Sequence, residues 1–235
     1  MFEVKSLNNQ QDPCNVIYKI NEKFIYNEGD KIFVKTDFLI QFLNESLEKP
    51  FILYTGDSDF SPSIFLSDDN LLHLLNNPLI IEWHAQNMII LHPKVKHMPI
   101  WLVPYEDKLE FYRKNKESLR ATVKKDEIFL AANSEVTNIP ERSSFITIQP
   151  MPFEEYIKTM ATYKYVLCPM GNGIDTHRFW EAQLCGCIPI IRCPKEFLPT
   201  YDGYNYISLP GWCYARLGSE NVIIKKESIF KINTV

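Results

Sequence analysis

Short apolar runs alternate along the chain with segments whose apolar residues repeat at helical spacing, and this alternation constrains the fold more than any other feature. The strand-like runs are 31–35, 51–54, 79–83, 95–103, 128–132, 145–148, 165–168 and 188–191. The segments of helical period are 36–48, 63–76, 107–121, 153–163 and 176–185. Because a helix between successive strands makes a parallel crossover, the pattern predicts an α/β fold with mainly parallel sheets.

The series of strands and helices restarts near residue 122, which predicts two Rossmann-like domains, 1–122 and 123–235. The 235 residues, 46% of them hydrophobic, suffice for two small cores. With 8 Gly, 15 Pro and no Gly/Ser-rich or Pro-rich tract, the chain lacks the composition of a flexible linker. We therefore expect the two domains to abut.

Charge and hydropathy exclude two classes of function. The formal net charge is -4, so the basic surface of a non-specific nucleic-acid binder is missing. No apolar run approaches the roughly 18 residues of a membrane span, and the N-terminus has no basic segment followed by an apolar core. These features predict a soluble, cytoplasmic protein without a membrane segment.

The cysteines are expected to be reduced, buried thiols. Six in a chain of this length are too few for a disulfide scaffold, and four of them lie in apolar surroundings. Cys185 and Cys187 are close in sequence, but no second Cys/His pair stands at zinc-binding spacing, so we expect no metal there.

A polar loop containing Gly171 and Gly173 joins the apolar strand 165–168 to the helix 176–185. Glycines let the backbone approach a ligand closely, and the exposed N–H groups at a helix start favour a phosphate. The loop lacks the Gly-x-Gly-x-x-Gly fingerprint, because Thr176 stands at the third glycine position, and it also lacks the lysine of a P-loop. Neither a dehydrogenase nor a P-loop NTPase is indicated.

The helix that follows presents His177, Arg178 and Glu181 within an arc of about 100°. Arg178 can donate a charge-assisted pair of hydrogen bonds to a phosphate, and Glu181 can accept hydrogen bonds from a ribose diol. Together they suit a nucleoside diphosphate. In the alternative interpretation Arg178 and Glu181 form an ordinary surface ion pair, and Asp175 only caps the helix.

Three segments together resemble the signature of the exostosin-like glycosyltransferases: FEEY at 153–156, YVLCPMGNGIDTHRFWEA at 165–182 and GCIPI at 186–190. Looser similarity to the family precedes them in WHAQN at 83–87, HPK at 92–94, MPI at 98–100, and in Asn133, Thr137, Asn138 and Arg142. The resemblance covers about residues 50–210, and its specific part is 153–190.

This resemblance implies a GT-B arrangement, in which two facing Rossmann-like domains bind the acceptor on the N-terminal side and the nucleotide sugar on the C-terminal side. It implies that the nucleotide sugar contacts Gly171, Asn172, Gly173, Asp175, Thr176, His177, Arg178 and Glu181, with Arg142 as a second phosphate cation. It also implies inverting transfer of a sugar from a nucleotide sugar, with a UDP-sugar favoured, to a hydroxyl of a glycan or glycoprotein. By the same family analogy, the transfer needs no metal ion or other cofactor.

An inverting transfer needs a base to take the proton of the acceptor hydroxyl, and Asp57, Asp59 and His84 are the candidates from the N-terminal half. Asp57 and Asp59 alternatively form a metal-binding Asp-x-Asp of the GT-A type, or are solvated loop carboxylates beside a buried histidine. If all three pointed away from the cleft between the domains, a non-catalytic carbohydrate- or nucleotide-binding module would be favoured. Trp83, Trp101 and Trp212 are candidates for stacking on a sugar or base, although core packing is the commoner role.

Overall fold

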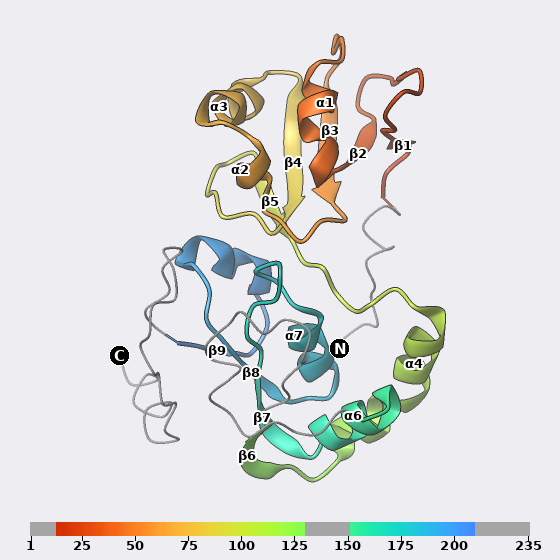
Figure 1. Ribbon diagram of the computed structural model, residues 1–235, viewed down its shortest axis with the longest axis vertical. Coiled ribbons are helices and arrows are strands. Elements are labelled where there is room, and N and C mark those ends of the chain that lie inside the picture. The colour runs from red at the N-terminus through yellow and green to blue at the C-terminus, as the bar shows by residue number, and fades with distance from the viewer. Residues whose placement is uncertain (1–12, 130–150, 210–235) are drawn as a thin grey trace.

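The computed structural model of the chain describes residues 13–129 and 151–209 (Figure 1). Within these ranges the N-terminal sheet has five strands in chain order: β1 (Val16–Ile17), β2 (Lys31–Lys35), β3 (Phe51–Gly56), β4 (Ile80–Gln86) and β5 (Val95–Met98). The C-terminal sheet has four described strands, also in chain order: β6 (Lys125–Phe129), β7 (Tyr163–Leu167), β8 (Ile188–Ile191) and β9 (Ile207–Ser208). Each pairing between these strands is parallel, which confirms the predicted α/β class.

The helices lie between the strands, as the alternation predicts. Those described are η2 (Thr36–Phe38), α1 (Leu39–Leu43), α2 (Pro62–Phe65), α3 (Asp68–Asn76), α4 (Glu106–Ala121), α6 (Phe153–Met160), α7 (His177–Leu184) and η3 (Lys195–Tyr201). The predicted strand 145–148 lies outside the described residues. No described helix combines the length and the apolar character that crossing a bilayer requires.

The predicted helix 63–76 is divided by two capping serines. The hydroxyl of Ser61 accepts a hydrogen bond from the N–H of Ser63 at 3.4 Å, and α2 begins there. The hydroxyl of Ser67 accepts one from the N–H of Asn70 at 3.3 Å, and α3 begins there. Each serine satisfies a backbone N–H that a helix start leaves without a partner, so two short helices replace one longer helix.

The connecting helices of the N-terminal sheet lie on one of its faces. Strands that follow one another in chain order, joined by right-handed crossovers, place their helices on the same side. Accordingly Leu39 of α1 and Leu74 of α3 pack with Leu53 of β3 in one buried core. The opposite face carries a smaller buried cluster that includes Phe33 and Tyr54.

Helix α4 packs in the core of the C-terminal sheet. Its buried residues Leu109, Tyr112 and Leu119 belong to the same cluster as Phe129 of β6 and Phe179 of α7. In Figure 1 a long connection leaves β5 and reaches α4, which lies beside α6. The chain therefore enters its second core before residue 122, and the division into domains at that residue stays a prediction.

Gly186 ends helix α7, as predicted. Its φ is 70°, a left-handed conformation that glycine adopts without strain. The N–H of Cys187 donates to the carbonyl of Ala182 at 2.9 Å, and the N–H of Gly186 donates to that of Gln183 at 3.1 Å. This is the Schellman pattern, which satisfies the last carbonyls of a helix. The guanidinium of Arg120 adds a hydrogen bond to the carbonyl of Gln183 at 2.8 Å.

The thiols agree with the sequence interpretation where the structure describes them. Cys168, Cys185, Cys187 and Cys193 are buried and free, while Cys14 is half-buried and Cys213 lies outside the described residues. Burial raises the pKa of the Cys193 thiol to about 12, so it stays protonated at neutral pH.

The carboxyl ends of β3 and β4 point toward the C-terminal half, as their arrowheads in Figure 1 show. Ligands of α/β folds bind at this end of the strands. The β3–α2 loop (residues 57–61) therefore faces the half of the chain that carries the β7–α7 loop (residues 168–176).

Candidate functional site

The β7–α7 loop makes a tight turn at the carboxyl end of β7. The N–H of Gly171 donates to the carbonyl of Gly173 at 3.0 Å. Thr176 is the N-cap residue of α7, but its side chain makes no capping hydrogen bond. The N–H of Phe179 donates to the carbonyl of Thr176 at 3.0 Å. The positive end of the α7 dipole favours an anion at this end of the helix. The second predicted phosphate cation, Arg142, lies outside the described residues.

Arg178 and Glu181, one turn apart on α7, are joined by a tyrosine from α6. The Nε of Arg178 donates to the hydroxyl of Tyr156 at 3.1 Å, and this hydroxyl donates to Oε2 of Glu181 at 3.3 Å. From α4, the hydroxyl of Tyr112 donates to Oε1 of Glu181 at 3.0 Å. Glu181 is only 7% exposed, so these donors offset the loss of its hydration.

Burial, together with the negative charge of Glu181, raises the pKa of both Tyr112 and Tyr156 well above the usual value for tyrosine. Both hydroxyls therefore stay protonated at neutral pH and donate hydrogen bonds to the carboxylate. Glu181 belongs to a buried network, not to the solvated helix surface that the ion-pair interpretation assumed.

Asp175 occupies a different environment from the one expected of a phosphate-loop residue. Its carboxylate is 3% exposed and accepts hydrogen bonds from the backbone N–H of Ile100 at 2.8 Å and the hydroxyl of Tyr201 at 3.0 Å. The indole N–H of Trp180 lies 3.0 and 3.1 Å from its two oxygens. Asp175 thus connects the segment after β5 to α7 and η3 through hydrogen bonds. These bonds differ from those of a helix cap, the role considered for Asp175 in the alternative interpretation.

We expect this buried carboxyl group to make the stability of the fold depend on pH. Burial raises the pKa of Asp175 to about 6, against the opposing effect of its hydrogen bonds and of His177. Since an unfolded aspartate has a pKa of about 3.9, the folded state binds the proton more tightly, and about 2–3 kcal/mol of stability is lost as pH rises from 4 through 6.

The free energy of unfolding in urea, measured at pH 4.5 and 7.5 for the parent and for Asp175→Asn, checks this expectation. The parent should lose more stability between pH 4.5 and pH 7.5 than the variant, because the variant has no titratable group at position 175. An equal change in both proteins would contradict it.

His177 and Trp101 connect the start of α7 to the segment after β5. The Nδ1 of His177 lies 2.6 Å from the carbonyl oxygen of Trp101 and must donate, because a carbonyl only accepts. Trp101 has φ 58°, and its ring packs against Trp180 at 4.3 Å between centroids. Of the other tryptophans considered for stacking on a ligand, Trp83 is buried in the core and Trp212 lies outside the described residues.

Two of the three candidate bases have partners within the N-terminal half. The carboxylate of Asp57 lies 3.8 Å from the ammonium of Lys35. The Nε2 of His84 lies 2.9 Å from Oε2 of Glu82, and its ring stacks on Tyr54 at 4.4 Å.

The third candidate, Asp59, reaches the β7–α7 loop. The Nδ2 of Asn172 donates to Oδ2 of Asp59 at 3.2 Å, across 113 positions in sequence. At the same contact, a Cβ added to Gly173 would lie 2.6 Å from the carbonyl oxygen of Asp59 and 3.0 Å from Nδ2 of Asn87. The two loops therefore touch, and Gly173 permits their close approach.

Sequence reasoning missed several residues that hold this site together. Asn87 and Tyr156 lie inside segments that resemble the glycosyltransferase family. The resemblance therefore marked their segments as part of a site, but it assigned these two residues no role. Tyr112 had no signal in the sequence, because its partner Glu181 is 69 positions away.

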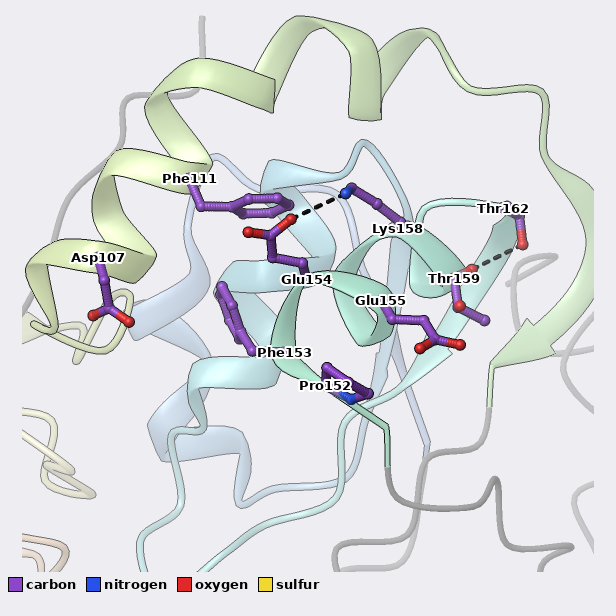
Figure 2. A pocket seen from close by; sticks show the side chains of 9 residues that line it. All are labelled: Asp107, Phe111, Pro152, Phe153, Glu154, Glu155, Lys158, Thr159 and Thr162. Atoms are coloured by element: carbon purple, nitrogen blue, oxygen red, sulfur yellow. Dashed lines mark hydrogen bonds and ion pairs between the residues drawn. The ribbon is translucent and has the colours of Figure 1, made fainter.

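A separate hollow of about 840 Å³ lies between α4 and α6 (Figure 2). Phe111 and Phe153 flank it, together with Glu154, which forms an ion pair with Lys158 at 3.1 Å. No described residue predicted for the nucleotide-sugar site lines it. Among residues 13–129 and 151–209, no three His, Cys, Asp or Glu side chains are grouped so that they could share a metal ion.

No model of a known protein family matches the chain. The resemblance to the exostosin-like glycosyltransferases therefore stays a hypothesis.

Proposed function

We propose that the chain is a glycosyltransferase that moves a sugar from a nucleotide-sugar donor, with a UDP-sugar favoured, to a hydroxyl of a glycan acceptor. The observation that carries the proposal is the 3.2 Å contact between Asn172 of the β7–α7 loop and Asp59 of the β3–α2 loop. A ligand on the first loop lies within reach of a carboxylate on the second, as transfer between two substrates requires. Inversion and independence of a metal ion come from the family resemblance and belong to the same proposal.

The donor half of the proposal rests on the β7–α7 loop and α7. The helix start and the guanidinium of Arg178 favour the diphosphate. Each oxygen of Glu181 accepts one tyrosine hydroxyl and has a second lone pair with which to accept a ribose hydroxyl. Tyr156 contacts both Arg178 and Glu181, so it orients the two groups relative to each other.

The proposed reaction is a displacement at the anomeric carbon of the sugar. The acceptor oxygen forms the new bond to this carbon, its proton passes to the carboxylate of Asp59, and the bond to the diphosphate oxygen breaks with its electron pair. Arg178 and the N–H groups at the start of α7 stabilise the negative charge that the leaving diphosphate gains.

A non-catalytic carbohydrate- or nucleotide-binding module is the alternative. It would be favoured if every candidate base turned away from the β7–α7 loop. The contact of Asp59 with that loop supports the enzyme instead.

Thermal denaturation in the presence of UDP, GDP and their sugar conjugates tests the donor site. One nucleotide at 100 times its Kd should add about 2.7 kcal/mol of stability, or about 5–10 °C in Tm, and EDTA should not change this. Arg178→Ala should bind about 10–100-fold more weakly, because hydrogen bonds to charged groups contribute about 1.5–3 kcal/mol.

Arg113→Ala is the matched control, since Arg113 pairs with Glu106 at the exposed surface of α4. Glu181→Gln is preferable to an alanine at that position, which would leave the hydroxyls of Tyr112 and Tyr156 without their acceptor. Stabilisation by no nucleotide, or undiminished binding by Arg178→Ala, would overturn the donor site. Binding without turnover of any donor would favour the binding module.

A further inference from the structure

Asn87, the residue directly after β4, has an unusual backbone conformation at the contact between the two loops. Its φ is 50°, in the left-handed region, and it is 2% exposed. Asparagine enters this region more readily than most residues, yet the conformation persists only where the surrounding structure holds it.

The side-chain amide of Asn87 bonds to both loops. Its Nδ2 donates to the carbonyl of Ser58 at 3.1 Å, and its Oδ1 accepts from the N–H of Asp175 at 3.0 Å. The adjacent Gln86 instead accepts from the N–H of Asp57 at 2.8 Å, a bond confined to the N-terminal half. The side-chain amide of Asn87 therefore donates a hydrogen bond to the β3–α2 loop and accepts one from the β7–α7 loop.

The surrounding contacts leave the loops little freedom to move separately. Gly173 packs so closely that a Cβ would lie 2.6 Å from the carbonyl oxygen of Asp59 and 3.0 Å from Nδ2 of Asn87. The carboxylate of Asp59 also accepts from Asn172 at 3.2 Å. A displacement of either loop at Asn87 thus moves Asp59 relative to the β7–α7 loop.

We propose that Asn87 is a positioning residue, which holds the loop bearing Asp59 against the β7–α7 loop so that this carboxylate faces the bound donor. The catalytic part of the inference rests on the proposed function, whereas the join between the loops does not. Asn87 acts through Asp59, and a shift of about 1 Å in a reacting group can lower turnover about 100-fold.

The first measurement is amide hydrogen exchange without nucleotide. In Asn87→Ala both hydrogen bonds are lost, and segments 57–61 and 171–176 should exchange about 10-fold faster. Asn87→Asp keeps an oxygen for the N–H of Asp175 but turns another toward the carbonyl of Ser58, so segment 57–61 should loosen more than segment 171–176. Unchanged exchange of both segments in Asn87→Ala overturns the join between the loops.

Thr55→Val is the matched control for lost stability. Thr55 accepts a buried hydrogen bond from the indole N–H of Trp83 at 2.9 Å, so the variant loses a bond inside the sheet while every described contact between the two loops is kept. Its exchange in both segments should stay within about 3-fold of the parent.

The second measurement uses the nucleotide sugar that stabilises the parent, together with its free nucleotide. Asn87→Asp keeps an acceptor for the N–H of Asp175 in the donor-binding loop, so it should lower kcat about 30-fold while the Kd of the nucleotide changes less than about 3-fold. Asn87→Ala, which loosens both loops, should lower kcat at least as much. Thr55→Val should keep both constants near those of the parent. A merely structural role would leave the kcat of the folded variant unchanged.

The outcomes separate this inference from the proposed function. Nucleotide binding and turnover in the parent, with an unaltered kcat in Asn87→Ala, overturn the positioning role and leave the glycosyltransferase standing. If no nucleotide binds or reacts in the parent, the proposed function fails and the positioning role is rejected with it, even where hydrogen exchange shows the loops joined through Asn87.

Discussion

Asp175→Ala is expected to lower the free energy of unfolding by about 4 kcal/mol, since each buried donor left without an acceptor costs about 1–3 kcal/mol. The donors concerned are the backbone N–H of Ile100, the indole N–H of Trp180 and the hydroxyl of Tyr201. They come from three separate parts of the chain, and the carboxylate they share is 3% exposed. Removing it leaves all three facing a buried gap.

Urea denaturation at pH 7 measures this loss. Asp126→Ala is the matched control, because Asp126 is exposed and pairs with Lys164 at the surface, where removal changes stability by less than about 0.5 kcal/mol. A loss below about 1 kcal/mol in Asp175→Ala would show that water or rearranged side chains satisfy the donors, contrary to the expectation.

Gly173→Ala is expected to destabilise the fold by about 3 kcal/mol, at the upper end of the usual effect of overpacking. The added Cβ would lie 2.6 Å from the backbone carbonyl oxygen of Asp59, a group that cannot move without displacing its loop. It would also lie 3.0 Å from Nδ2 of Asn87. The variant therefore has to separate the β3–α2 and β7–α7 loops.

Gly171→Ala is the control for stability, because a Cβ at Gly171 meets no atom within 4 Å. Its free energy of unfolding should stay within about 0.5 kcal/mol of the parent or rise slightly, as glycine replacements in ordinary conformations do. Equal stability of the two variants would indicate that the loops are not held together as described. A crystal structure or hydrogen exchange of Gly173→Ala should show the β3–α2 loop displaced.

Local sequence determined most of the longer elements of this protein, whereas the two-residue strands β1 and β9 were not predicted. Apolar alternation located β2, β3, β7 and β8 and the helices between them, since those signals depend on residues only a few positions apart. Gly186 marked the end of α7 for the same reason: its hydrogen bonds involve the preceding helical turn. The predicted helix 63–76 proved to be two helices, because the capping serine Ser67 starts a new helix within that range.

The roles of the candidate site residues depended on long-range contacts, which periodicity does not encode. The sequence placed Asp175 beside two glycines and so indicated a ligand or a cap, but Ile100, 75 positions away, and Tyr201, 26 away, make it a buried junction. Asp59 was one of three equal candidates until folding brought it against Asn172. The sequence by itself determined which of the longer strands and turns form, because those signals are short-range. Only the tertiary structure decided which polar groups meet, because each of these bonds joins segments whose separation in the chain has no local signature.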